Sequence, residues 1–141
     1  MKKNVKITLL SEQTRADEKD SSKQRTTGTL EKRENGDYII EYTEPDAEMG
    51  KSFSCIQVEG CKKVLLKREG LYQTHFTIEQ GKAHKTLYRT PYGEMELEVY
   101  GKKVDATLNA EGGSVYLFYS LTSNGQPISE NKLIINIKSQ K

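Results

Sequence analysis

The sequence is short of the residues that mark several large classes of protein. Its two cysteines, Cys55 and Cys61, are too few for a disulfide scaffold or a four-thiolate zinc site, and we expect both to be reduced thiols. The longest apolar runs, such as 133–135, fall far short of the ~20 residues that a membrane helix needs. No signal-peptide pattern follows the N-terminal lysines. These absences predict a soluble, cytoplasmic protein with no membrane partner.

Charge of one sign is also scarce. The 22 basic and 20 acidic side chains leave a formal net charge of only +2. Electrostatic binding of a polyanion requires several Lys or Arg gathered on one surface, and this balance is weak evidence for such a surface. The composition therefore predicts no nucleic-acid partner.

The main pattern that is present is an alternation of apolar and polar residues with period two, typical of half-buried β-strands. In the clearest run, 94–100, three glutamates alternate with Met95, Leu97 and Val99. We interpret the glutamates as a solvated face, because catalytic carboxylates need environments that drive their pKa values apart. Further strands are predicted at 5–9, 38–43, 56–58, 64–66, 72–78, 104–110, 114–122 and 128–138.

Turn signals separate these runs at short, regular intervals. Asn35-Gly36 and Asn124-Gly125 favour tight hairpins, and Thr90-Pro91-Tyr92-Gly93 fits a type I turn. No helix-length segment lies between most of the strands, so the chain is predicted to be one all-β, antiparallel domain over residues 1–141. Segment 11–25 lacks an apolar period and is predicted to be a flexible loop, as is the segment from 44 to 50.

About eight to ten short antiparallel strands would leave two exposed edges in an open sheet, and closure into a barrel removes them. The inward face of a small barrel is filled by alternate side chains, which agrees with the alternation. A two-sheet sandwich predicts the same alternation. Periodicity alone therefore leaves both architectures open.

A family resemblance favours the barrel. The residues that carry it are 5–9, 42–44, 68–70, Phe76, 88–93 and 113–121, and the most specific piece is the Thr-Pro-Tyr-Gly turn. On these residues the chain resembles the YwiB-like family of uncharacterised bacterial proteins over nearly its whole length. The resemblance implies an up-and-down, calycin-like or lipocalin-like barrel, found chiefly in Gram-positive bacteria, with no established activity. The likeness to true lipocalins is architectural only, because their Gly-x-Trp signature needs a tryptophan that this chain lacks.

No group of residues satisfies the requirements of a recognisable reaction. The chain has no Gly-x-Ser-x-Gly elbow, phosphate-binding loop or dinucleotide-binding turn, so we expect no enzyme, no catalytic residue and no cofactor. His75 and His84 flank the reversal at Gln80-Gly81, and one register would bring them together. Two histidines are too few for zinc, which takes at least three protein ligands, so no metal site is predicted.

Arg68 continues the face that carries Val64 and Leu66, so its side chain is expected to point inward near the end of its strand. An inward guanidinium must be paired or hydrogen-bonded. Two interpretations stay open: a structural plug paired with Glu44, or a fixed cation that receives the carboxylate or phosphate of a ligand.

Five tyrosines fall on or near predicted inward faces: Tyr38, Tyr42, Tyr72, Tyr88 and Tyr119. They either fill the barrel or line a pocket. The leading hypothesis is a non-enzymatic barrel that binds a small apolar or anionic molecule in its interior. The predicted ligand-binding residues are Arg68, Tyr72, Phe76, Tyr88 and Tyr119. The alternative is a protein-interaction or scaffold module with a filled barrel, and the oligomeric state stays open.

Overall fold

The computed structural model describes residues 2–46, 50–60, 62–70, 73–109 and 111–140, which form strands and no helix. The ten strands are β1 (Lys2–Arg15), β2 (Glu18–Lys32), β3 (Tyr38–Asp46), β4 (Gly50–Glu59), β5 (Lys63–Glu69), β6 (Thr74–Glu79), β7 (Ala83–Thr90), β8 (Gly93–Asn109), β9 (Gly112–Ser123) and β10 (Gln126–Ser139). Within these ranges, no helix has the length and hydropathy to cross a bilayer.

All ten strands belong to one antiparallel sheet, in the order β6-β5-β4-β3-β2-β1-β10-β9-β8-β7. The first and last strands of the chain pair in its middle, which leaves β6 and β7 at the two ends. These two strands meet again, because the backbones of Gln73 and Arg89 exchange hydrogen bonds of 2.9 and 3.1 Å. The predicted all-β, antiparallel barrel is therefore confirmed, as a nearly closed barrel.

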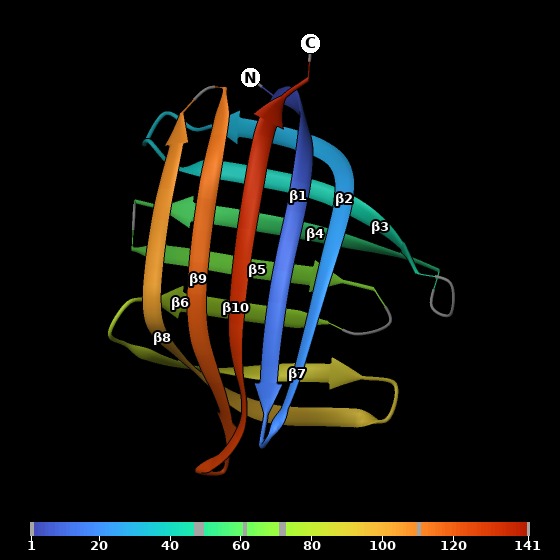
Figure 1. Cartoon of the computed structure of the whole chain (residues 1–141), viewed down its shortest axis with the longest axis vertical. Helices are drawn as coiled ribbons and strands as arrows, with labels where there is room; N and C mark the ends of the chain where they lie inside the picture. The colour runs from blue at the N-terminus through green and yellow to red at the C-terminus, as the bar shows by residue number, and fades with distance from the viewer. Residues whose placement is uncertain (1, 47–49, 61, 71–72, 110, 141) are drawn as a thin grey trace.

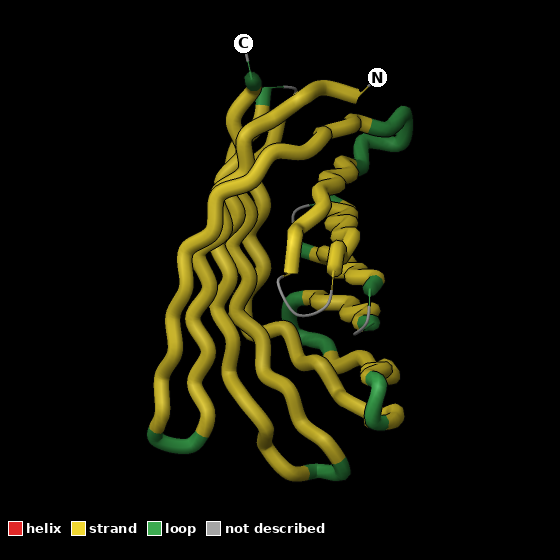
Figure 2. Tube along the Cα trace, turned by 90° about the vertical axis from the view of Figure 1, so that its right-hand side faces the viewer, coloured by secondary structure: helices red, strands yellow, loops and turns green. Residues whose placement is uncertain are grey.

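The barrel is flattened into two crossing layers. In Figure 1, β1, β8, β9, β10 and most of β2 run upright in front of β3 to β7, and Figure 2 shows the two layers from the side. β2 and β8 bend from one layer to the other, at Gly28 and near Gly101. A Cβ at Gly28 would lie 2.1 Å from the carbonyl oxygen of Glu41, so the corner has room only for glycine. The segments 94–100 and 104–110, predicted as separate strands, form the single bent strand β8 except for residue 110, which lies outside the described residues.

The apolar core fills one part of the barrel. Several inward residues of β1, β9 and β10 are fully or almost fully buried, among them Val5, Ile7, Leu117 and Ile135. The predicted solvated face of β8 is confirmed: Leu97 and Val99 are buried, whereas the glutamates that alternate with them are exposed or half-buried. Both Asn-Gly hairpins are also confirmed as the β2–β3 and β9–β10 turns.

The prediction of a flexible loop over 11–25 is wrong. β1 continues to Arg15, β2 begins at Glu18, and the two strands pair without interruption from Ser11 opposite Ser22 to the end of the hairpin. The apolar period is missing because the inward side chains here, including Gln13, face the polar part of the interior instead of the apolar core. The loop predicted at 44–50 is strand at both ends, and residues 47–49 lie outside the described residues.

Candidate functional site

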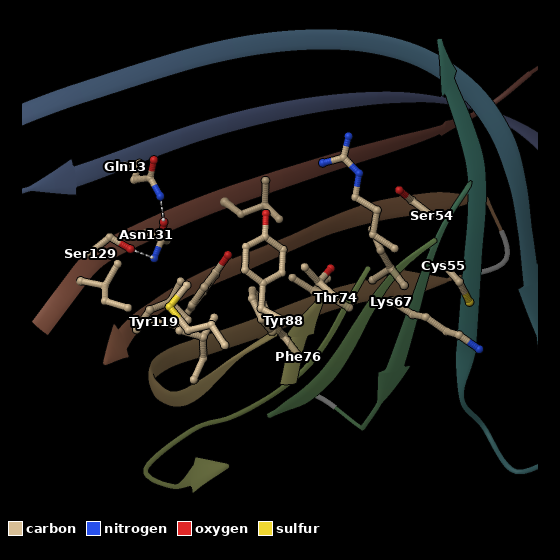
Figure 3. A pocket seen from close by; sticks show the side chains of 18 of the residues that line it. Gln13, Ser54, Cys55, Lys67, Thr74, Phe76, Tyr88, Tyr119, Ser129 and Asn131 are labelled. Atoms are coloured by element: carbon tan, nitrogen blue, oxygen red, sulfur yellow. Dashed lines mark hydrogen bonds between the residues drawn. The ribbon is translucent and has the colours of Figure 1, made fainter. Parts of the chain in front are cut away.

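A cavity of about 560 Å³ lies between the two layers of the barrel. Its walls come from β1 and from β3 to β10, so segments from nearly the whole chain meet there. The cavity is open to solvent on one side, and Figure 3 shows its polar and aromatic side chains. The space between the layers is therefore only partly filled by the core.

The apolar wall of the cavity is built by side chains from both layers. Phe76 of β6 and Tyr119 of β9 meet edge to face, with ring centroids 6.2 Å apart and ring planes at 64°. Leu97 and Leu133 extend this wall along β8 and β10. Burial raises the pKa of Tyr119 to about 12, so its hydroxyl stays protonated and is able to donate a hydrogen bond within the cavity.

A short chain of hydrogen bonds forms a polar wall across β1 and β10. The Nε2 atom of Gln13 donates to Oδ1 of Asn131 at 3.1 Å, and Nδ2 of Asn131 donates to Oγ of Ser129 at 3.0 Å (Figure 3). Asn131 and Ser129 are buried, at 8% and 6% exposure. Because each amide is oriented by its neighbour, the group presents a fixed set of donors and acceptors to the cavity.

Arg68 lies at the edge of the cavity near the end of β5. Its guanidinium Nη2 donates a long hydrogen bond of 3.4 Å to Oγ of Ser52, and Ser54 lies directly opposite it on β4. The side chain lines the cavity, as the inward orientation predicted, yet it is largely exposed. The side chain of Glu44, its predicted partner, lies outside the described residues.

The structure brings four of the five predicted site residues to this one cavity: Arg68, Phe76, Tyr88 and Tyr119. Tyr72 lies outside the described residues. The ligand-binding role of the five residues stays a prediction. Of the other tyrosines expected to point inward, Tyr42 lines the cavity and Tyr38 packs against the core.

Sequence reasoning missed the polar wall. Gln13, Ser129 and Asn131 occupy inward positions, since they continue the alternation of Leu9 in β1 and Leu133 in β10. The signal was available: polar residues in phase with an apolar stripe mark a place where the interior is polar. The loss of the apolar stripe in β1 instead suggested that the strand ended there.

The two histidines do not come together. His84 shares a hydrogen bond of 3.1 Å with Glu79, and this bond lowers the pKa of the Glu79 carboxyl. His75 lies on the outer face, opposite Lys67 of β5. No group of three or more His, Cys, Asp or Glu side chains in the described ranges is placed to hold a metal ion.

Cys55 is a free thiol whose pKa is raised by burial, and Cys61 lies outside the described residues.

Comparison with known proteins places the chain among uncharacterised barrels. A family model described as a domain of unknown function, DUF1934, matches residues 7–135. The chain belongs to this family. The chain is 30% identical over 98 residues to the uncharacterized beta-barrel protein YwiB of Bacillus subtilis (strain 168). The match covers 69% of this chain and 66% of YwiB, so it spans just under two-thirds of that relative's length.

A solved structure supports the same grouping. The crystal structure of the ywiB protein from Bacillus subtilis matches this DUF1934 chain with a TM-score of 0.87 over 99% of this chain and 94% of that one, at 18% sequence identity. At this identity the likeness shows the fold alone. The predicted resemblance to the YwiB-like family is confirmed. The family description assigns no activity, so it gives no function for the cavity.

Proposed function

We propose that this barrel binds a small, mainly apolar molecule in the cavity between its layers and does not transform it. The observation that carries the proposal is an open cavity of about 560 Å³, which lies within the ~300–1,000 Å³ typical of ligand pockets. Its aromatic and aliphatic wall suits an apolar ligand, and the Gln13–Asn131–Ser129 chain supplies the few oriented polar groups that such sites use.

An unfilled interior favours this proposal over a scaffold with a filled barrel. The scaffold alternative is supported by exposed apolar side chains that a partner protein could cover: Tyr92 in the β7–β8 turn is 92% exposed, and Leu87 of β7 is 48% exposed. The lipocalin-like architecture and the Gram-positive setting are expectations from the family resemblance, and the cytoplasmic location is an expectation from the sequence. The absence of enzymatic activity is likewise an expectation.

Dye binding tests the proposal. N-phenyl-1-naphthylamine is neutral and gains fluorescence in apolar surroundings, so wild-type protein is expected to raise its emission and shift it to the blue. Thr74→Trp fills the cavity from β6 and is expected to weaken this binding by about tenfold, which corresponds to about 1.4 kcal/mol.

A matched control lies on the same strand. Thr77 of β6 faces the outer surface, so Thr77→Trp adds the same ring without filling the cavity and is expected to bind the dye like wild type. If wild-type protein gives no fluorescence gain, or if the two variants bind the dye equally well, the cavity is not the binding site. The exposed residues near the β7–β8 turn would then become the next candidate.

A further inference from the structure

The outer face of the front layer carries a group of four cations, on the opposite side of the sheet from the core. Lys6 lies between buried Val5 and Ile7, so its side chain points away from the interior. In the register of the sheet, Lys6 of β1 lies directly opposite Lys138 of β10. On the other side of β1, Thr8 pairs with Arg25 and Leu10 pairs with Lys23 of β2. The exposed side chains of Lys6, Lys23, Arg25 and Lys138 are called the basic face below.

None of these four cations forms an ion pair with a described carboxylate. Other lysines of β1 and β2 do: Lys2 lies 3.1 Å from Glu41, and Lys19 lies 3.3 Å from Glu12. Like charges directly opposite each other on neighbouring strands are destabilising, so the pairing of Lys6 with Lys138 is a repulsion that the described residues leave uncompensated. A bound anion would relieve it.

Two adjoining open grooves cross the basic face, with volumes of about 450 and 490 Å³. Both are lined by Thr8, Arg25, Asn136 and Lys138, and one reaches Ser114 of β9. The described residues that line them include no carboxylate. Hydroxyl and amide groups therefore lie between the cations, which is the set of side chains that proteins use to contact phosphate oxygens.

We propose that the basic face binds the sugar-phosphate backbone of a single-stranded nucleic acid. The face spans three neighbouring strands, about 10 Å at ~4.8 Å per strand spacing, and this width suits one phosphodiester chain better than the two chains of a duplex. No aromatic side chain lines the grooves in the described ranges, so bases have no stacking platform and binding is independent of sequence.

This inference revises the expectation drawn from composition. A net charge of +2 sums over the whole chain and says nothing about where the charges lie. The fold places on one face four cations that pair with no described carboxylate, and electrostatic binding of a polyanion requires such a group of cations. The basic face is separate from the cavity, so the inference stands or falls independently of the proposed ligand.

Salt-dependent fluorescence anisotropy tests the basic face. The probe is a fluorescein-labelled oligothymidylate of about 12 nucleotides, within the roughly 4–16 nucleotides of known single-strand sites. With a slope of about −0.7 per neutralised phosphate, four contacts give about −2.8, so affinity is expected to fall about 50-fold between 50 and 200 mM salt. For Lys6→Gln/Lys138→Gln, the slope is expected to halve and the loss to fall to about sevenfold.

The control removes the same charge elsewhere. Lys62 in the β4–β5 turn and Lys85 of β7 are exposed and form no ion pair with a described carboxylate, so Lys62→Gln/Lys85→Gln is expected to keep the wild-type slope. The proposal is overturned by absence of binding at 20 mM salt, or by equal slopes for the two double variants. Tighter binding of a DNA duplex overturns the single-strand assignment, and equally tight binding of polyglutamate overturns the nucleic-acid assignment in favour of an acidic protein.

Discussion

Gly101 in the bend of β8 lies against the main chain of Glu79 at the end of β6, so close that a Cβ on Gly101 would stand 2.4 Å from the Glu79 carbonyl oxygen. Two backbone hydrogen bonds fix the contact: Gly81 donates to the Gly101 carbonyl at 2.8 Å, and Gly101 donates to the Lys82 carbonyl at 3.1 Å. This contact ties the β8 corner to the β6–β7 turn.

Gly101→Ala is expected to destabilise the barrel by about 1–3 kcal/mol, because the added methyl group forces backbone to move in a packed corner. Chemical denaturation followed by circular dichroism measures the change. Lys103→Ala alters an exposed residue of the same strand and is expected to stay within about 0.5 kcal/mol of wild type. Equal stability of the two variants would show that the corner accommodates a side chain.

The contact between Phe76 and Tyr119 joins the two layers across the cavity. A double-mutant cycle with Phe76→Leu and Tyr119→Leu is expected to give a coupling energy of about 0.5–1.5 kcal/mol, the usual range for an edge-to-face pair beyond its buried area. Unfolding free energies of the wild type, both single variants and the double variant supply the four measurements. Additive effects would mean that the rings contribute only by filling space.

The raised pKa of Tyr119 predicts that the free energy of unfolding decreases at alkaline pH. Burial raises its pKa from 10.0 to about 12, so the folded state holds the phenol proton more tightly than the unfolded state. The associated stability is complete below pH 10 and is lost as pH rises from 10 to about 12. Tyr119→Phe is expected to lose less stability over this window, measured as the shift in denaturation midpoint at a series of pH values. Parallel curves for the two proteins would contradict this expectation.

Much of the barrel follows from local sequence. Alternation predicts an apolar face that carries Leu97 and Val99, and the Asn124-Gly125 dipeptide predicts a hairpin; the structure confirms both. These features depend on neighbouring residues alone. The two halves of the sheet are joined by the pairing of β1 with β10, more than a hundred residues apart, which local patterns do not reveal. The barrel was therefore predicted through the family resemblance.

Each error has its own physical cause. Gln13 lies inward in a strand whose interior is polar, so the apolar stripe that identifies a strand is missing there. Gly101 interrupts the pattern of β8 at a corner, where a glycine signals close backbone approach instead of a turn. The basic face was hidden for another reason, since Lys6 and Lys138 become neighbours only through the long-range register of the sheet.

The buried amide of Asn131 gives a prediction for the polar wall. Asn131→Leu keeps the approximate side-chain size but leaves the Gln13 amide and the Ser129 hydroxyl without this partner, and it is expected to cost about 1–3 kcal/mol. Asn136→Leu alters an exposed asparagine of the same strand and is expected to change stability by at most about 0.5 kcal/mol. Thermal or chemical unfolding distinguishes the two variants.

A double substitution distinguishes the cost of an unsatisfied hydrogen-bonding group from the cost of changed side-chain packing. Replacing both partners of a hydrogen bond by apolar groups costs less than leaving one partner unsatisfied, so Gln13→Leu/Asn131→Leu is expected to be less destabilised than the sum of its single variants. Because the double variant makes the cavity wall apolar, its affinity for N-phenyl-1-naphthylamine is expected to rise. If the two substitutions add fully and the dye affinity stays unchanged, the Gln13–Asn131 pair does not define the polarity of the cavity.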